Sequence, residues 1–526
     1  MSANKMPKPD TRGIYPTVQR MVYAAGMAHA SKTAVICHHT RLTYAALFRR
    51  VRNLAAGFMS LGLQQGDRIT LISYNCHRIL ELDMLAYLYG YVICPVHPKA
   101  SPVAWEQGIR EHGAKAVVIA PSLAGTLINQ QPDFEKQIRL VSWDTPDIRH
   151  VDYEHLAETN GYPTLPSLDP EDPVSLNLTS GTTGASKAVI HTQGTWAASA
   201  GNVLQYFAPI EPDDVMLHVG PMTHSSSTFI VPFLVQGGCA VIEQDFDPDR
   251  IAHRARLGQA GRFQIFPPMF RDLLEHNGCR RDLPGQVRII EYGGSPSDTT
   301  ILLEAMDAFG TVLEQGYGQT ETMPPVTVML PEEHTSDHLL TAGRIIPGVT
   351  LNILDFEGNP LPADAIGEVA VSGGNVTPGY WNNPDETRKH RINGYWLTGD
   401  RGFLSPEGWL TLHDRQTDII IRRGFNIAPK EVEAAARAFP GVTEAVAFAV
   451  PHPQDGEAVA LAVVAPGDDT IPNETLANHI ATQVSEYARP DTILNIEAIP
   501  RNANGKVMRE TLKHRFWKNK SRNING

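Results

Sequence analysis

Helical and strand patterns alternate repeatedly along this chain of 526 residues, and the alternation limits the folds open to it. The segment LTYAALFRRVRNLAAGFMSLGL, from Leu42, places apolar residues three and four apart, and the turn residues Gln64 to Asp67 separate it from the apolar run RITLIS. The same order recurs where AWEQGIREHGA precedes KAVVIA and where TILLEAMDAFG precedes TVLEQGYG. Because this alternation is typical of parallel sheets covered by helices, the sequence predicts an α/β fold with stacked, mostly parallel sheets.

The length and a change of pattern along the chain predict more than one domain. A chain of 526 residues exceeds the size at which a single hydrophobic core stops growing. After Gly343, short alternating strands separated by Gly, Pro and Asn turns predict a β-rich subdomain. We therefore expect residues 1–414 to form a large N-terminal domain of two stacked αβ-layered sheet subdomains plus the β-rich subdomain. Residues 415–526 are expected to form a small α+β C-terminal domain.

Composition and charge exclude several classes of protein. The chain is 42% hydrophobic and 19% charged, which is ordinary for a globular enzyme. Its net charge of −12 gives no basic surface for nucleic acid. The N-terminus lacks the apolar core of a signal peptide, no run of about 18 apolar residues exists, and the five cysteines form no CxxC pair. We expect a cytoplasmic protein without a transmembrane segment, with reduced thiols and no nucleic-acid partner.

The segment TSGTTGASK, from Thr179 to Lys187, has the chemistry of a phosphate-binding loop. It directly follows the apolar strand VSLNL, its glycines let backbone N–H groups approach a phosphate, and its hydroxyls and lysine can bind the oxygens. It is not a Walker A loop, because Ser186 replaces the second glycine and Ala188 replaces the Ser or Thr. The sequence therefore predicts a different kind of nucleotide site here.

The loop resembles the phosphate loop of the adenylate-forming superfamily, which includes acyl-CoA synthetases, aryl-CoA ligases, luciferases and peptide-synthetase adenylation domains. Four further segments match that superfamily in order and spacing: YGQTE (317–321), YWLTGD (395–400), DRQTDIIIRRGFNIAPKEVE (414–433) and PRNANGKVMRE (500–510). The motif pattern is most similar to that of acyl-CoA and aryl-CoA ligases.

The resemblance implies a two-step reaction. ATP first activates a carboxylic acid to acyl-AMP with release of pyrophosphate, and coenzyme A then takes the acyl group as a thioester. The alternative is a stand-alone adenylation enzyme that loads the acid onto a carrier-protein phosphopantetheine. A smaller alternative is an oxidative or non-catalytic relative. A homodimer is left open.

The resemblance also assigns catalytic roles. Lys506 is implied to bridge the carboxylate and the α-phosphate as charge builds in the transition state. Thr320 offers a hydroxyl to the α-phosphate, and Glu321 offers a hard oxygen ligand to Mg²⁺. His224, in PMTHSSS, is placed near the bound carboxylate and the mouth of the thiol tunnel. The C-terminal domain is implied to be mobile, and it brings in Lys506 for the first step and the Gly424 loop for the second.

The remaining candidates bind the nucleotide, the acyl group or the thiol. Asp400 is implied to accept hydrogen bonds from the ribose hydroxyls, with Arg415 in support. The full ATP and AMP set is Thr179, Ser180, Gly181, Thr182, Thr183, Gly184, Lys187, Gly293, Gly294, Ser295, Tyr317, Gly318, Thr320, Asp400 and Arg415. The acyl-pocket set is His224, Ser226, Phe229, Gly294, Gly316 and Met323, and the thiol-tunnel set is Arg423 and Gly424.

Some positions depart from the superfamily pattern. Thr417 stands at the usual hinge position, where Asp or Lys is common. Arg422 and Arg423 are expected to meet the phosphates of coenzyme A or an acidic carrier protein. PMTHSSS contains no Asp to hold an α-ammonium group, so a free α-amino acid is disfavoured as the substrate. A medium-chain fatty, aryl or modified carboxylic acid fits the mostly apolar pocket.

Overall fold

A computed structural model describes most of the chain and divides it into two compact units. Unit 1 comprises residues 1–351, 371–396 and 408–410, and unit 2 comprises residues 352–370, 397–407 and 411–526. Each unit is described by itself below. The described residues are 16–130, 138–144, 150–179, 187–267, 269–295, 297, 299–415, 420–422, 425–427, 429–452, 455–467, 471–501 and 507–517.

A seven-stranded sheet forms one half of unit 1, in the order β7-β6-β5-β3-β4-β8-β9. All neighbours pair in parallel except β8 and β9, which are antiparallel. All four residues of β5, with the sequence AVVI, are buried, as expected for a parallel strand covered on both faces. The strands are β3 (Arg68–Ile72), β4 (Val92–Pro95), β5 (Ala116–Ile119), β6 (Arg139–Ser142), β7 (Val151–Asp152), β8 (Pro173–Thr179) and β9 (Lys187–Thr192).

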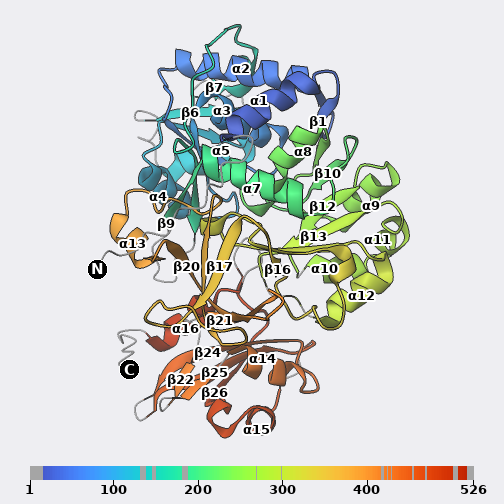
Figure 1. Cartoon of the computed structure of the whole chain (residues 1–526), viewed down its shortest axis with the longest axis vertical. Coiled ribbons are helices and arrows are strands. Elements are labelled where there is room, and N and C mark those ends of the chain that lie inside the picture. The colour runs from blue at the N-terminus through green and yellow to red at the C-terminus, as the bar shows by residue number, and fades with distance from the viewer. Residues whose placement is uncertain are drawn as a thin grey trace. The chain divides into compact units, whose positions relative to one another are not determined.

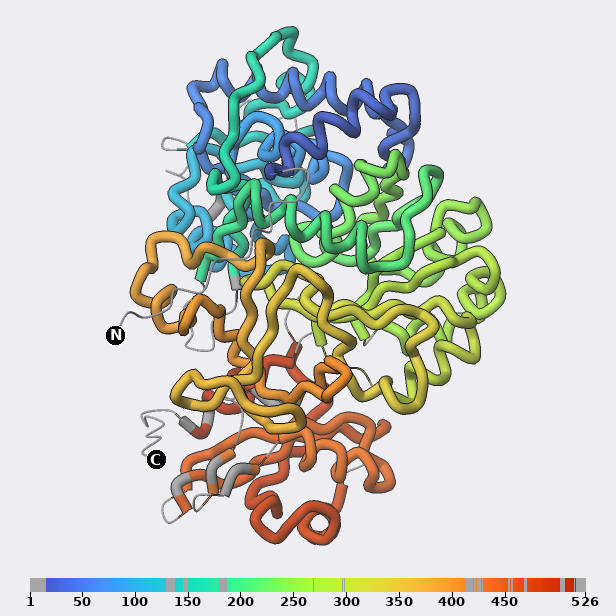
Figure 2. Tube along the Cα trace, viewed as in Figure 1, coloured from blue at the N-terminus to red at the C-terminus, as the bar shows by residue number. Residues whose placement is uncertain are grey.

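A nine-stranded sheet forms the other half, in the order β16-β15-β14-β13-β12-β10-β11-β1-β2. Its middle, from β14 to β1, is parallel, and both edges are antiparallel. Because β1 pairs with β11, the blue N-terminal trace lies beside the green trace of the middle of the chain (Figure 2). The strands are β1 (Thr33–Cys37), β2 (Thr40–Thr43), β10 (Val215–His218), β11 (Cys239–Ile242), β12 (Arg262–Ile265), β13 (Ile289–Gly293), β14 (Leu313–Tyr317), β15 (Thr327–Met329) and β16 (Arg344–Ile345).

Helices separate and cover the two sheets. One hydrophobic core contains residues of both sheets and of α1, α2, α3, α7 and α8, and α3 is buried on almost every side because it lies within this core. Residues of α4 and α5 cover the other face of the seven-stranded sheet, and α9 to α12 group along the nine-stranded sheet (Figure 1). The helices are α1 (Val18–Ala28), α2 (Tyr44–Ser60), α3 (His77–Tyr89), α4 (Pro102–His112), α5 (Pro121–Gln130), α6 (Tyr153–Glu158), α7 (Gln193–Tyr206), α8 (Ile230–Gln236), α9 (Pro248–Arg256), α10 (Met269–Glu275), α11 (Asn277–Asp282) and α12 (Thr299–Phe309).

Local sequence sets the helix ends, as α4 illustrates. The Ser101 hydroxyl accepts a hydrogen bond from the Ala104 N–H at 3.2 Å, and Pro102 occupies the first turn. Gly113 ends the helix in the left-handed region, with φ of 61°. Short 3₁₀ helices also occur: η2 (Ser225–Phe229), η3 (Thr320–Thr322), η4 (Pro331–Glu333) and η5 (Glu486–Ala488).

A third sheet follows, in the order β17-β18-β20-β19, with β21 paired to β20. It corresponds to the β-rich region expected after Gly343. Its elements are β17 (Val349–Leu354), β18 (Gly367–Gly373), α13 (Pro384–Lys389), β19 (Arg391–Ile392), β20 (Tyr395–Leu404) and β21 (Leu410–Arg415).

The C-terminal part of unit 2 is a sheet with helices on both faces. The strand order is β23-β22-β25-β24, and β26 pairs with β25 in parallel. Residues of α14 and α15 pack on one face, and Leu512 of α16 packs on the other. The elements are β22 (Ile420–Arg422), β23 (Phe425–Ile427), α14 (Pro429–Arg437), β24 (Glu444–His452), β25 (Gly456–Val464), α15 (Asn473–Gln483), β26 (Thr492–Asn495) and α16 (Arg509–Trp517).

The predicted α/β class is therefore confirmed: two stacked, helix-covered sheets, a β-rich region and a smaller α+β part. The expected boundary between residues 414 and 415, and the mobility of the C-terminal domain, stay predictions. Within the described part of the chain, no helix is long and apolar enough to cross a membrane.

Candidate functional site

The predicted phosphate loop connects the two strands of a hairpin. Strands β8 and β9 pair antiparallel, with Thr179 opposite Lys187. The predicted loop residues Ser180, Gly181, Thr182, Thr183 and Gly184, and the Thr179 side chain, lie outside what the structure describes. Lys187 is thus held at the base of the loop by strand pairing.

Lys187 takes part in a cluster of polar side chains within unit 1. Its ammonium group forms an ion pair with Glu386 of α13 and lies 5.3 Å from the centre of the Tyr380 ring. The Tyr380 hydroxyl donates a hydrogen bond to Glu321 Oε1 at 2.9 Å. The hydrogen bond from Lys187 is the main reason that the pKa of Glu386 falls to about 2. The cation predicted for phosphate and the carboxylate predicted for the metal therefore contact the same tyrosine.

His191 joins the hairpin to the YGQTE segment. Its Nε2 lies 2.7 Å from the Thr320 carbonyl oxygen, and its Nδ1 lies 3.4 Å from the Ser175 hydroxyl. A carbonyl only accepts, so Nε2 carries the proton. Burial lowers the pKa of His191 to about 4, which keeps the ring neutral at neutral pH. This imidazole fixes the backbone of the residue expected to meet the α-phosphate.

Two glycine-containing loops follow the carboxyl ends of neighbouring parallel strands, where ligands bind in open α/β sheets. Gly293 of β13 lies opposite Gly316 of β14, and a Cβ on Gly293 would lie 2.3 Å from the Gly316 carbonyl oxygen. Gly294 follows with φ of 77°, which favours glycine, and Ser295 follows it. These strand ends can therefore approach a flat ligand closely, which suits residues predicted to bind ATP and AMP.

The segment after β14 folds back on itself. The Tyr317 carbonyl accepts a hydrogen bond from the Val326 N–H at 2.8 Å. A Cβ on Gly318 would lie 2.9 Å from Pro324 Cα, so this position has no room for a side chain. The Thr322 and Met323 carbonyls both accept hydrogen bonds from Asn375 Nδ2, at 2.7 and 2.9 Å. The loop that carries Thr320 and Glu321 is therefore held at both ends.

His224 lies at the start of η2 in a neutral form. Its Nδ1 is 3.2 Å from the Thr223 hydroxyl, and its ring centre is 6.0 Å from that of His97. Burial, then the neighbouring His97, lowers the pKa of His224 to about 4. A neutral imidazole suits a position beside a carboxylate that must stay reactive.

The other acyl-pocket candidates have different surroundings. Ser226 is fully buried, and its hydroxyl lies 2.8 Å from His218 Nδ1. The Phe229 ring packs on Phe207 at 5.8 Å, and a Cβ on Gly316 would lie 3.0 Å from the same Phe207 ring. Phe207 therefore links two of the predicted pocket positions. Met323 is buried in the core that contains residues of both sheets of unit 1.

In unit 2, Asp400 lies on β20. Its N–H donates to the Thr398 hydroxyl at 3.1 Å, and the neighbouring Gly399 N–H donates to Glu368 Oε1 at 3.2 Å. Arg415 ends β21, and its side chain is not among those described. The predicted Lys506, Arg423, Gly424 and Thr417 all lie outside the described residues.

Arg422 has several partners within the C-terminal part of unit 2. Its guanidinium forms ion pairs with Asp455 at 3.1 Å and Asp491 at 2.9 Å, and it donates to the carbonyls of Tyr487 and Arg489. These contacts occupy its donors within the C-terminal fold. The expected contact of Arg422 with coenzyme A phosphates or a carrier protein stays a prediction.

Three residues of the site were absent from the sequence prediction: His191, Tyr380 and Glu386. His191 stands four residues after Lys187, just beyond the predicted phosphate loop, but only the fold brings it to Thr320. Tyr380 and Glu386 lie about 200 residues beyond the phosphate loop, and no local motif signalled them. Their role is visible only through contacts.

The described residues supply few metal ligands. No group of three or more His, Cys, Asp and Glu side chains in the described ranges could hold a metal ion. Glu321 presents one carboxylate, of which Oε1 already accepts from Tyr380. One carboxylate completed by substrate phosphates and water is a common arrangement for Mg²⁺, so the residues fit that ion.

Comparisons with known proteins give two family-model matches and several relatives of similar length. Residues 23–381 match the family model described as "AMP-binding enzyme", and residues 431–506 match "AMP-binding enzyme C-terminal domain". The chain is 27% identical to the medium/long-chain-fatty-acid–CoA ligase FadD8 of Mycobacterium tuberculosis, over 94% of this chain and 89% of that protein. It is 29% identical to the feruloyl-CoA synthase of an Amycolatopsis species, over 92% and 96%.

Other similar proteins differ in their acceptor. The chain is 27% identical to the fatty acid–[acyl-carrier-protein] ligase ScoC of Streptomyces coeruleorubidus, over 97% of this chain and 99% of that protein. Among solved structures, the amide bond synthetase McbA of Marinactinospora thermotolerans is 25% identical with a TM-score of 0.85, over 95% and 99% of the two chains. ATP-bound MatB of Rhodopseudomonas palustris is also 25% identical with a TM-score of 0.85, over 97% and 100%.

Proposed function

Because the chain belongs to the AMP-binding enzyme family, we propose that it is an acid–thiol ligase that uses ATP to join a carboxylic acid to coenzyme A. In the first step a carboxylate oxygen attacks the α-phosphorus of ATP, the bond to the β-phosphate breaks, and pyrophosphate leaves. In the second step the thiol sulfur attacks the acyl carbon and AMP leaves. Atoms and charges balance without an oxidant or reductant.

The cluster of Lys187, Tyr380 and Glu321 carries the proposal. It sets a cation and a carboxylate on either side of one tyrosine, at the base of the predicted phosphate loop. We assign Lys187 to the phosphates and Glu321 to Mg²⁺, with Thr320 beside the α-phosphate. A bound Mg²⁺ would neutralise phosphate charge there. We assign His224, as a neutral imidazole, to the acyl site.

Further assignments concern residues of unit 2. We assign Asp400 and Arg415 to the ribose, Lys506 to the adenylation transition state, and Arg423 and Gly424 to the thiol tunnel. We also propose residues 1–414 and 415–526 as the functional domains. The cytoplasmic location and a homodimer stay predictions.

Transfer to a carrier protein is the second candidate. ScoC, which matches this chain over almost its whole length, is named for that acceptor. FadD8 and feruloyl-CoA synthase, at similar identity, are named for coenzyme A. We favour coenzyme A because more of these relatives use it.

Pyrophosphate release tests the first step. The enzyme is incubated with Mg-ATP and benzoic, cinnamic or octanoic acid, and acid-dependent pyrophosphate is expected. Coenzyme A and a phosphopantetheinylated carrier protein are then compared as acceptors by mass spectrometry. Thioester on the carrier alone would overturn the coenzyme A assignment.

Lys506→Ala separates the two steps. We expect the variant to lose acyl-AMP formation by about 100-fold or more, because it lacks the cation that stabilises transition-state charge. Conversion of supplied acyl-AMP to thioester should remain close to wild type. Equal loss of both steps would contradict the assigned role of Lys506.

A further inference from the structure

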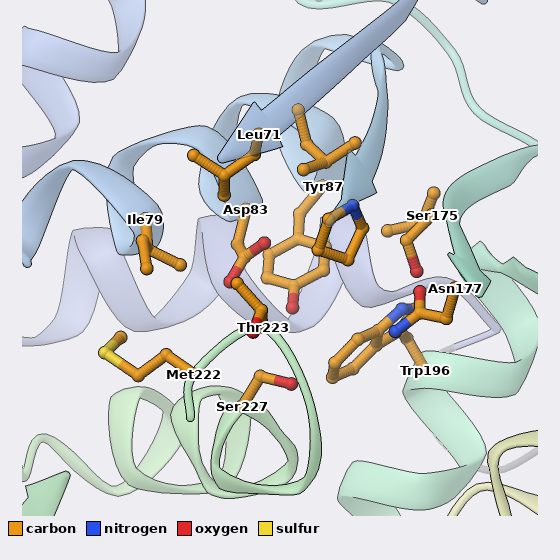
Figure 3. A pocket seen from close by; sticks show the side chains of 13 residues that line it. Leu71, Ile79, Asp83, Tyr87, Ser175, Asn177, Trp196, Met222, Thr223 and Ser227 are labelled. Atoms are coloured by element: carbon orange, nitrogen blue, oxygen red, sulfur yellow. The ribbon is translucent and has the colours of Figure 1, made fainter. Parts of the chain in front are cut away.

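A small cavity of mixed polar and apolar lining lies beside the His224 segment, wholly within unit 1. It has a volume of about 20 Å³ and is lined by residues of α3, β3, β4, β8, α7 and the segment 222–227 (Figure 3). Apolar side chains form part of its wall, among them Leu71, Ile79, Ile93 and Met222. About 10–15 Å³ is enough for one water molecule, so the cavity admits one water or one small polar group.

Four polar atoms that line the cavity have no hydrogen-bond partner in the part of the chain that the structure describes. They are Asp83 Oδ2, the Tyr87 hydroxyl, Asn177 Oδ1 and Trp196 Nε1, and each atom is buried. Figure 3 shows the Asp83, Tyr87 and Asn177 side chains turned toward the same space from α3 and β8. Buried polar atoms without partners are rare in native proteins, so four around one cavity indicate a bound polar group.

The chemistry of these atoms selects the kind of group. The Trp196 N–H only donates, Asn177 Oδ1 only accepts, and the Tyr87 hydroxyl does both. Burial raises the pKa of Asp83 to about 8, so its carboxyl group is mostly protonated at neutral pH and also donates and accepts. No fixed charge then faces the cavity from these four side chains. A hydroxyl group, which is neutral, small, and both donor and acceptor, matches them.

The cavity adjoins the acyl site proposed above. Thr223 and Ser227, which line it, flank His224 in the sequence. The Thr223 hydroxyl is 3.2 Å from His224 Nδ1, and the Ser227 hydroxyl donates to the His224 carbonyl at 2.6 Å. A group in the cavity is therefore one side chain away from the imidazole expected beside the reacting carboxylate.

We propose that this cavity binds a hydroxyl group carried by the acid substrate, and that Asp83 and Tyr87 determine specificity for hydroxylated carboxylic acids. The inference rests on the proposed acid-activating function and narrows its substrate class. Neither residue takes part in the chemical steps. When the acid lacks the hydroxyl group, the buried polar atoms of both residues stay without a hydrogen-bond partner. This strongly disfavours binding of such an acid.

Matched pairs of acids test the inference. The pairs are cinnamic and 4-hydroxycinnamic, benzoic and 4-hydroxybenzoic, and octanoic and 8-hydroxyoctanoic acid, with kcat/KM measured by pyrophosphate release. For at least one pair, wild type should prefer the hydroxylated acid by about tenfold or more. Tyr87→Phe and Asp83→Leu should bring that ratio close to one, whereas Asp83→Asn, which keeps a donor and an acceptor, should largely preserve it.

Thr70→Val is the matched control. Thr70 also carries a buried hydroxyl without a partner among the described residues, but it does not line the cavity. This variant should keep the wild-type ratio, and thermal melts establish that each variant folds. Tyr87→Phe removes a single oxygen atom, so it keeps the test decisive if Asp83→Leu fails to fold.

The outcomes separate the two proposals. Pyrophosphate release without any preference for hydroxylated acids, or a preference that Tyr87→Phe leaves unchanged, overturns the inference while the proposed function stands. The cavity would then hold only an ordered water. No acid-dependent pyrophosphate from any of the six acids, in folded wild-type enzyme, overturns the proposed function and the inference with it.

Discussion

At the scale of single residues, Lys187 already has a partner before any phosphate arrives. Its ion pair with Glu386 is only partly exposed, with side-chain exposures of 14% and 18%. Glu386 also contacts Lys389 at 3.0 Å and His390 at 3.4 Å, so it keeps Lys389 as a cationic neighbour if Lys187 leaves. A phosphate that binds Lys187 must therefore compete with the Glu386 carboxylate, which keeps other partners when Lys187 is released.

Glu386→Gln should make ATP bind more readily. Removal of the carboxylate releases Lys187, and a partly exposed ion pair contributes about 1 kcal/mol, so the KM for ATP should fall by roughly fivefold. The measurement is pyrophosphate release at varied ATP with a saturating acid. Asp385→Asn is the control, because Asp385 lies on the same helix and forms an ion pair with the exposed Arg388. An unchanged KM in Glu386→Gln would contradict the competition.

At the scale of elements, the nucleotide site depends on how closely β13 and β14 approach at their carboxyl ends. Gly293 and Gly316 face each other there, and the space between their backbones leaves no room for a methyl group. Backbone atoms, unlike a flexible side chain, cannot move aside. The geometry of the loops that follow β13 and β14, which carry residues of the proposed nucleotide site, therefore depends on one glycine.

Gly293→Ala should force the two strand ends apart. Overpacking against backbone costs about 1–3 kcal/mol, and we expect a lower melting temperature together with a KM for ATP raised roughly tenfold. Calorimetry and steady-state kinetics measure the two effects. Gly201→Ala, in α7 with nothing within 4 Å of the new Cβ, should be neutral or stabilise by about 0.5–1 kcal/mol. Wild-type kinetics for Gly293→Ala would refute the tight-approach argument.

At the scale of the whole molecule, unit 1 encloses several neutral histidines. Burial lowers the pKa of His112, His191, His218 and His224 to about 4 in each case. The unfolded chain protonates these groups near pH 6.5, whereas the folded chain does not until about pH 4. The stabilisation that these four neutral histidines contribute is therefore fully present above pH 6.5 and is lost as the pH falls from 6.5 toward 4.

His112→Leu should reduce this acid sensitivity. His112 is fully buried, and neither ring nitrogen has a partner among the described residues. The difference between the pKa of His112 in the unfolded and folded chains predicts that, at pH 5, the wild-type free energy of unfolding falls by about 2 kcal/mol. The variant does not show this loss. Chemical unfolding of both proteins at pH 7.5 and pH 5 measures the change in their difference. If the difference in unfolding free energy between the two proteins is the same at both pH values, His112 does not contribute to the acid sensitivity.

Local patterns in the sequence predicted the elements but not their neighbours. The helix expected from Leu42 appears as α2, and the run RITLIS appears as β3, because each pattern reflects its own burial. The pairing of β1 with β11 joins segments about 200 residues apart, which no local pattern contains. Sheet order therefore had to come from the structure.

The same limit applies to the site. Lys187, Thr320 and Glu321 were found because they belong to short motifs. Tyr380 was missed because a tyrosine near a turn signals nothing until the fold brings it to Glu321. Asp83 was missed because it is one of several charged residues in the sequence of α3, and its unpartnered oxygen marks it only in the structure.

The hydrogen bond from His191 to Thr320 has a consequence for protein engineering. His191 belongs to the seven-stranded sheet, and Thr320 follows a strand of the nine-stranded sheet. A chimera that takes one of the two sheets from a relative has its crossover point between these two residues. Positions 191 and 320 then come from different parents and can fail to form the hydrogen bond. Recombination libraries made from this enzyme should therefore keep a hydrogen-bond donor at position 191 in every member, whichever parent supplies the rest of β9.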